Sequence, residues 1–213
     1  MPAFPQPIVQ DQMEKAMSDY TGLVNASDVD APHVGGNIVE GDPFTYAPSV
    51  WDYLIRRFAV TSVLDLGSGM GYSARYFYKQ GLQVLAVDGM KQNCLNAVYP
   101  TVQVDLTKTK VLTNVDLVHC QEVVEHIEER YVHNLLSSMA CGKFIVMTNA
   151  LKGQGGYHHV NEQPTEYWAN HLRNYNYEVL AEDTNRVRKL AEKDGAIYLA
   201  KTGMVLAKRK ENR

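Results

Sequence analysis

Two clusters of titratable side chains are the first candidates for chemistry. The segment "CQEVVEHIEER" places Glu122, Glu125 and His126 close together, and "GQGGYHHVNEQPTEYW" carries His158 and His159 behind three glycines. Carboxylate and imidazole groups are common ligands of divalent cations. A neutral histidine without a metal can instead act as a general base at pH 7. We therefore take Glu122, Glu125, His126 and His159 as candidate catalytic residues and as candidate metal ligands.

Each cluster also has an ordinary structural interpretation. An acid such as Glu125 is favoured in the first turn of a helix, where it complements the helix dipole. His158 and His159 could form a hydrogen-bonded pair that stabilises their loop. If one histidine enters a site, we expect His159, because adjacent residues of an extended segment point to opposite sides. The following Val160 can then return to the core.

The elements that must position these clusters alternate between apolar runs and helical patterns. Strands are expected over residues 62–66, 83–88, 101–105, 115–120, 143–148, 177–183 and 202–209, and helices over 48–60, 72–80, 91–99, 128–140, 164–175 and 185–193. Such alternation predicts a parallel sheet with right-handed crossovers. Both clusters follow strand ends, and open α/β sheets bind their ligands at the carboxyl ends of their strands. The sequence therefore predicts one site at this edge.

A glycine loop, "VLDLGSGMGY", follows the first expected strand and opens a helix. Gly67, Gly69 and Gly71 allow a sharp turn and a close approach of the backbone to a ligand. Asp88 ends the next strand, where an acid can bind the ribose hydroxyls of a nucleoside. Asp65 would repel a pyrophosphate but would attract an ammonium or sulfonium group. The pattern favours S-adenosylmethionine, and the alternative is a tight turn without a ligand.

The motifs "VLDLGSGMGY", "VLAVDG", "VQVDL" and "VDLVHCQEVVEHI" resemble those of class I S-adenosylmethionine-dependent methyltransferases in order and spacing. The resemblance runs from about residue 47 to the end. It implies a Rossmann-like α/β fold with a mostly parallel seven-stranded sheet, an antiparallel last strand and helices on both faces. It also implies a set of cofactor-binding residues: Asp65, Gly67, Ser68, Gly69, Gly71, Asp88, Gly89, Met90, Asp105, Leu106 and Gln121. Of these, Asp105 and Leu106 would lie beside the adenine.

The acid–histidine set resembles the E-x-x-E-H…H arrangement of small-RNA 3′-terminal 2′-O-methyltransferases. It also resembles the E-x-x-E-H segment of ubiquinone-pathway O-methyltransferases. The stretches "HVGGNIVEGDPFTY" and "GQGGYHHVN" resemble a subgroup of bacterial and phage methyltransferases. We expect an N-terminal arm over residues 1–46, with a short helix over 10–23, that closes over the cofactor as a lid. Residues 47–213 would form the methyltransferase domain.

Composition narrows the partners. A formal net charge of -3 argues against a protein that holds a polyanion, so nucleic acid is a weaker expectation than a small acceptor. Cys94, Cys120 and Cys141 read as free thiols of a reducing cytoplasm. No apolar run approaches the ~18 residues of a membrane span, and the N-terminus lacks the features of a signal peptide. We expect a cytoplasmic protein without a membrane partner.

The favoured function is an S-adenosylmethionine-dependent methyltransferase that acts on an oxygen of a small polar acceptor such as a sugar or glycan precursor. One alternative is a 2′-O-methyltransferase of RNA ends that uses a divalent metal. Another is a non-catalytic cofactor-binding subunit. The remaining histidines, His33, His119, His133 and His171, have no cluster around them and are interpreted as structural or solvated.

Overall fold

The computed structural model describes residues 31–35 and 41–209. Within these residues, seven strands form one sheet in the order β3-β2-β1-β4-β5-β7-β6. The strands are β1 Ser62–Leu66, β2 Gln83–Asp88, β3 Thr101–Gln103, β4 Val115–Cys120, β5 Gly142–Met147, β6 Tyr177–Val179 and β7 Met204–Lys208. Strands β1 to β5 run parallel, and β7 pairs antiparallel with both β5 and β6. This confirms the expected mostly parallel, Rossmann-like sheet.

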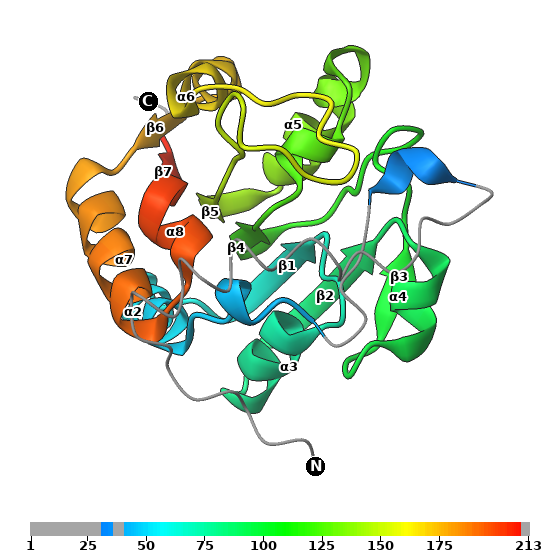
Figure 1. Cartoon of the computed structure of the whole chain (residues 1–213). Helices are drawn as coiled ribbons and strands as arrows, with labels where there is room; N and C mark the ends of the chain where they lie inside the picture. Colours follow the sequence, from blue (N-terminus) through cyan, green and yellow to red (C-terminus); the bar gives the residue numbers. More distant parts are fainter. Residues whose placement is uncertain (1–30, 36–40, 210–213) are drawn as a thin grey trace.

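Helices cover both faces of the sheet (Figure 1). They are α2 Pro48–Phe58, α3 Tyr72–Lys79, α4 Lys91–Asn96, α5 Val132–Met139, α6 Thr165–Asn174, α7 Ala181–Asp194 and α8 Ile197–Thr202. Short 3₁₀ turns lie at η2 Pro32–Val34, η3 Pro43–Thr45, η4 Val124–His126 and η5 Glu129–Tyr131. None of the described helices has the length and hydropathy that a membrane span requires.

Two buried clusters form the core, one on each face of the sheet. Side chains alternate between the faces along a strand, so Val63 of β1 packs in one cluster and its neighbour Leu64 in the other. The first cluster joins β1 and β4 to α2, α3, α7 and α8, and includes Trp51. The second joins them to α5 and α6, and includes Trp168. Both faces of the sheet are therefore buried. A ligand can reach the sheet at the ends of its strands.

The largest differences between the expected and the observed elements concern β6, α8 and the turn after β4. The strand expected over 177–183 ends at Val179, and α7 begins at Ala181. This strand lies at the sheet edge, and the acids Glu182 and Asp183 favour the first turn of a helix. Helix α8 was not expected at all. Glu125 and His126 do not open the long helix that follows β4: they lie in the separate turn η4, because Ile127 returns to an extended backbone.

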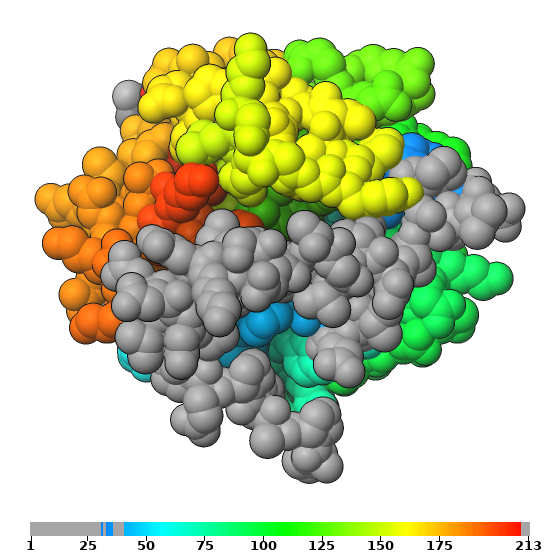
Figure 2. Space-filling model, in the orientation of Figure 1, coloured from blue at the N-terminus to red at the C-terminus, as the bar shows by residue number. Residues whose placement is uncertain are grey.

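The expected N-terminal arm is described only over 31–35 and 41–46, and the helix expected over 10–23 lies outside the described residues. Phe44 is buried, so the end of the arm packs on the domain. In the space-filling view the loop after β5, drawn in yellow, forms part of the outer surface of the molecule (Figure 2). The division into an arm and a domain stays a prediction.

Candidate active site

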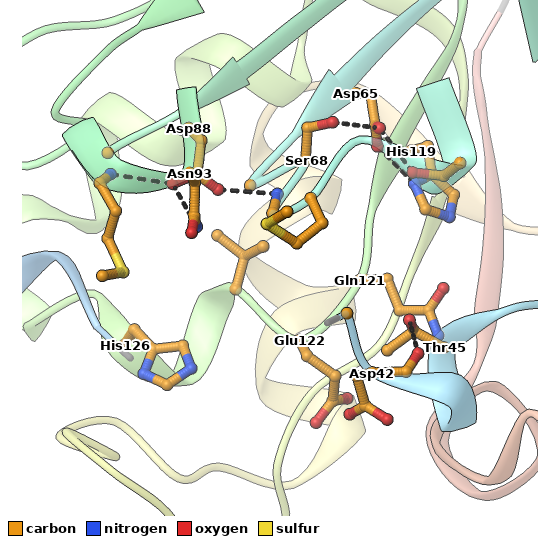
Figure 3. Close-up of a pocket in the computed structure, with 18 of the residues that line it drawn as sticks. Asp42, Thr45, Asp65, Ser68, Asp88, Asn93, His119, Gln121, Glu122 and His126 are labelled. Atoms are coloured by element: carbon orange, nitrogen blue, oxygen red, sulfur yellow. Dashed lines mark hydrogen bonds and ion pairs between the residues drawn. The ribbon is translucent and has the colours of Figure 1, made fainter. Parts of the chain in front are cut away.

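A cavity of about 1080 Å³ opens at the carboxyl ends of β1, β2 and β4. Its size suits a small-molecule or cofactor site. Asp65, Asp88 and Gln121 line it from the three strand ends, and Figure 3 shows them around one space. The turn η3 and the loop over 154–159 contribute further walls. The predicted edge of the sheet therefore does carry a pocket.

The glycine loop combines tight packing with open space. Gly67 has a φ of 67°, and a Cβ there would lie 2.3 Å from a methyl carbon of Val123. Gly69 has a φ of 55°, and among the described residues no atom lies within 4 Å of a Cβ built on it. Gly71 faces Tyr99 and does not line the cavity, so it shapes the loop without facing a ligand. Gly69 is the place where a ligand can approach the backbone.

Asp88 already binds three protein donors. Its Oδ2 accepts from the backbone N–H of Gly69 at 2.8 Å, and its Oδ1 accepts from Met90 N at 2.8 Å and Asn93 Nδ2 at 2.9 Å. A carboxylate has about four acceptor positions, so about one remains for a ligand hydroxyl. Burial raises the pKa of Asp88, although the three hydrogen bonds act against this. Its expected role toward a ribose stays a prediction.

Gln121 carries a buried amide without a partner. It is 7% exposed, and neither its side-chain nitrogen nor its oxygen has a hydrogen-bond partner among the described residues. Buried polar groups in proteins are normally paired. Because Gln121 lines the cavity, a polar ligand would satisfy it. The orphaned amide, together with the open face of Gly69, fits an adenosylmethionine-sized ligand with polar ends.

The far end of the cavity is lined by Gly89, Met90, Asp105 and Leu106, which the resemblance assigned to the cofactor. Asp105 accepts from Lys108 Nζ at 2.9 Å and contacts His33 Nε2 at 2.7 Å. His33 belongs to the arm, so residues 31–35 lie against the strand ends here. No local sequence pattern indicates this contact, because the two partners lie 72 positions apart.

The carboxylate of Asp65 is buried and has protein hydrogen-bond partners on both oxygens. It is 1% exposed. Its Oδ2 accepts from Ser68 Oγ at 2.9 Å and Ser73 Oγ at 2.6 Å, and its Oδ1 lies 2.6 Å from His119 Nδ1. Burial alone would raise the pKa of Asp65, but His119 and the two serines hold it below its ordinary value. His119, interpreted above as unclustered, is therefore part of a buried network.

The acid–histidine residues converge as the spacing suggested. Glu125, His126 and His159 each offer a ligand atom, and these atoms lie within 4.8 Å of one another. Glu125 is fully buried, and no donor of the described residues makes a well-formed hydrogen bond to its carboxylate oxygens, although its carboxyl group is in hydrogen-bond contact with that of Glu122. The rings of His126 and His159 stand edge to face with centroids 5.0 Å apart. His159 lines the cavity, whereas His158 does not.

Backbone contacts hold the histidine loop in this place. The N–H groups of Val160 and Asn161 donate to the carbonyl of Glu125 at 2.9 and 3.0 Å. His158 has a φ of 55°, and its carbonyl lies 3.3 Å from Nδ1 of His126. The left-handed residue reverses the loop so that the next side chain, His159, faces the cluster. Its Nδ1 lies 3.1 Å from Glu162.

Glu122 lies beside this set, at the mouth of the same turn. Its N–H donates to Thr148 Oγ1 at 2.8 Å, and that hydroxyl donates back to Glu122 Oε1 at 2.8 Å. Burial raises the pKa of Glu122 to about 7, and the charge of Asp42 adds to this. Figure 3 shows the carboxyl groups of Glu122 and Asp42 side by side. Glu122 is not among the three residues of the tight set, so its part as a ligand stays a prediction.

The pKa shifts of Glu125 and His126 follow from burial and from neighbouring groups of like charge. Burial raises the pKa of Glu125 well above its ordinary value, and the charge of Glu122 raises it further. Burial lowers the pKa of His126 to about 4, and the charge of His159 adds to this. His126 is therefore neutral at pH 7, with a lone pair available on its ring.

Comparison with known proteins gives the class. Residues 64–140, less than half of the chain, match the family model described as "Methyltransferase domain". No curated protein matches the chain. Together with the fold and the cavity, the match identifies an S-adenosylmethionine-dependent methyltransferase. The non-catalytic alternative is set aside, whereas the subgroup suggested by "GQGGYHHVN" is still a prediction.

Solved structures share the fold at low identity. The methyltransferase domain of bacterial CtHen1-CN has a TM-score of 0.50 and 18% identity over 62% of this chain and 85% of its own. A Haemonchus contortus phosphoethanolamine N-methyltransferase, solved with S-adenosylhomocysteine, has a TM-score of 0.50 and 15% identity over 81% and 56%. The [4+2]-cyclase SpnF has a TM-score of 0.52 and 12% identity over 93% and 92%. The fold therefore does not identify the acceptor.

Proposed function

We propose that this enzyme methylates a hydroxyl oxygen of a small polar acceptor, such as a sugar or glycan precursor, and that Glu125, His126 and His159 hold a divalent cation at the acceptor end. One observation carries the proposal: these three residues converge beside the cofactor cavity around a fully buried carboxyl group that has a second acid, Glu122, beside it and forms no ion pair among the described residues. A buried carboxylate is normally paired with a positive charge.

The donor set suits a cation in its charges as well as its geometry. A buried, unpaired carboxyl near a second acid either keeps its proton or needs a positive partner. His126 is neutral at pH 7 and can offer a ring nitrogen. One oxygen and two imidazole nitrogens match the preferences of ions such as Zn²⁺, Mn²⁺ or Fe²⁺. Such an ion supplies Lewis acidity that lowers the pKa of a bound hydroxyl.

The chain's own residues supply the rest of the chemistry. Gly69 and Asp88 bind and orient the methyl donor, so that its sulfonium faces the turn after β4. Glu122, whose pKa is about 7, is matched to accept the proton of the attacking hydroxyl near neutral pH. In-line transfer from a sulfonium gains most from such positioning. If no cation binds, His159, or His126 in its neutral form, takes the place of the general base.

The lining of the acceptor side supports a neutral polyol. The carboxyl groups of Asp42 and Glu122 lie there, together with the half-buried aromatic ring of Tyr46. Carboxylates accept hydrogen bonds from hydroxyl groups, and an aromatic face packs against the apolar face of a sugar ring. The same carboxylates repel a phosphate backbone. This favours a small acceptor over a nucleic acid.

A 2′-O-methyltransferase of RNA ends is the second candidate. The observation in its favour is that three of the four E-x-x-E-H…H residues, Glu125, His126 and His159, meet in space, as its resemblance to the small-RNA enzymes requires. The net charge of -3 and the acidic acceptor side weigh against it. The two candidates share the cation and differ in the acceptor, so one assay separates them.

The test measures methyl transfer to two acceptor panels. Tritium-labelled S-adenosylmethionine is offered with neutral mono- and disaccharides, and with short RNAs that end in a 2′-hydroxyl or a 2′-deoxy residue. We expect label in the sugars, lost with a chelator and restored by Mn²⁺. Label in RNA only when the terminal 2′-hydroxyl is present would favour the second candidate. Label in neither panel would contradict the proposed acceptor, and transfer that ignores the chelator would contradict the cation.

A further inference from the structure

A buried histidine below the glycine loop has no part in the chemistry described so far. His119, in β4, is 4% exposed. Its Nδ1 lies 2.6 Å from Asp65 Oδ1, and its Nε2 accepts from Trp51 Nε1 at 3.3 Å. The ring also meets Trp51 and Phe77 edge-on, with centroids 5.9 and 5.7 Å away. Strands β1 and β4 and helices α2 and α3 thus fix its orientation.

These contacts determine where the proton of His119 lies. An indole N–H can only donate, so Nε2 of His119 must present its lone pair to Trp51. The single proton of the neutral ring is then on Nδ1 and points at Asp65. Ser68 and Ser73 donate to the other oxygen of that carboxylate. Donors on both oxygens stabilise the ionised form of Asp65.

We propose that His119 is a positioning residue for the methyl donor: as the Nδ1–H tautomer, it keeps Asp65 charged and oriented under the turn that receives the amino-acid part of S-adenosylmethionine. Ser68, held by Asp65, couples the network to that turn, and its N–H donates to Val87 at 2.9 Å. The ammonium group of the ligand then meets a fixed negative charge. The inference deepens the proposed function and rests on it only for the identity of the donor.

Few charged groups surround the pair formed by His119 and Asp65. Asp88 lies across the loop, and the charge of Asp65 raises its pKa. Cys120, next in the strand, is a buried thiol whose pKa burial raises. Among the described residues, the His119 ring is the one basic group within salt-bridge distance of Asp65. Removing the ring's N–H would therefore leave one carboxylate oxygen without a donor.

The experiment compares two ligands and three proteins. S-adenosylhomocysteine carries the amino-acid part, and adenosine lacks it. Calorimetry between pH 5.5 and 8.5 is done on the wild type, on His119→Phe, which keeps an aromatic ring but removes both nitrogens, and on His119→Asn. The amide nitrogen of the asparagine takes the place of Nδ1 and can still donate to Asp65.

For His119→Phe we expect S-adenosylhomocysteine to bind about tenfold more weakly at pH 7, the effect of one lost hydrogen bond to a charged group. The loss should grow as the pH falls, because Asp65 takes up a proton more readily, while adenosine binds as in the wild type. His119→Asn should restore most of the affinity and a flat pH profile. Equal loss of both ligands, or no loss of either, overturns the proposal.

A second measurement keeps the inference testable if His119→Phe does not fold. Two-bond ¹H–¹⁵N correlation spectra of the labelled wild type report which ring nitrogen of His119 is protonated. We expect a neutral ring with the proton on Nδ1 at pH 7. A proton on Nε2, or on both nitrogens, overturns the proposal. Failure of the wild type to bind either ligand is a different outcome, which contradicts the donor itself.

Discussion

Replacing Glu125 by glutamine tests the cation hypothesis through stability, without knowledge of the acceptor. Glu125 is fully buried, forms no ion pair among the described residues, and has the carboxyl group of Glu122 in hydrogen-bond contact. Burial and the charge of Glu122 raise its pKa well above the ordinary value. Without a cation, the ionised carboxylate therefore costs stability. An amide of the same shape removes the charge, while leaving a polar group in the site.

The sign and size of the effect follow from linkage. The folded state holds the proton of Glu125 above the ordinary carboxyl pKa of about 4.3, where the unfolded state has lost it. The stability of the metal-free wild type must then fall as the pH rises through that window. At pH 8 we expect the glutamine variant to be more stable by about 1–2 kcal/mol, since an unpaired buried charge costs more than an unpaired amide.

A bound cation should reverse this order. At a concentration of 100 times its Kd, a ligand of the folded state alone adds about 2.7 kcal/mol. The wild type should gain about this much with Mn²⁺, and the glutamine variant should gain little. The assay is urea unfolding at pH 5 and pH 8, with either a chelator or MnCl₂.

Glu166→Gln is the matched control, because Glu166 is exposed on α6. It should stay within about 0.5 kcal/mol of the wild type throughout. If the wild type is the more stable protein in chelator at pH 8, the carboxylate is satisfied and the reasoning is wrong. If Mn²⁺ stabilises both variants equally, Glu125 does not bind it.

Three further predictions concern the donor site, the sheet and the arm. Asp88→Asn should weaken S-adenosylhomocysteine binding by roughly 1.5–3 kcal/mol, and calorimetry that shows an unchanged Kd would contradict the ribose assignment. Asp116 is partly buried, which raises its pKa, but Lys143 and Thr61 hold the pKa below the ordinary value. Asp116→Asn should therefore lower the free energy of unfolding at pH 7, with the difference shrinking in acid unfolding curves as the pH falls below about 4. His33→Ala removes a contact of the arm with the end of β3 and should raise the Kd of the cofactor a few-fold, about 1 kcal/mol or less for a part-exposed pair; an unchanged Kd would argue against a lid.

The bounds of the central strands could be predicted closely from the sequence, and those of the edge strand β6 less well. Strands β1, β2 and β4 begin and end at the predicted residues, because strands buried on both faces read as unbroken apolar runs. Strand β6 pairs on one side only, and its pattern ran on into helix α7. Helix α8 has six residues, too few to show a helical period.

The candidate site was predictable where it depends on strand ends and not where it depends on packing. The loop after β5 and the turn after β4 had to share one edge, so the approach of His159 to His126 followed from topology. The partners of His119 and His33 lie 54 and 72 positions away. Only the three-dimensional packing of the strands and the arm brings them together. A histidine that looks solitary in the sequence can therefore be part of a site.

The turn after β4 joins the cofactor cavity to the set formed by Glu125, His126 and His159. Glu122 has a φ of 54°, a left-handed conformation that costs a residue other than glycine roughly 1–3 kcal/mol. Glycine would adopt it freely, yet the chain keeps a glutamate there and holds it with both hydrogen bonds of Thr148. This bend directs Gln121 into the cofactor cavity and sets Glu125 against the histidines. A side chain retained against backbone strain, between the two halves of the site, is best explained by the chemistry of its carboxyl group.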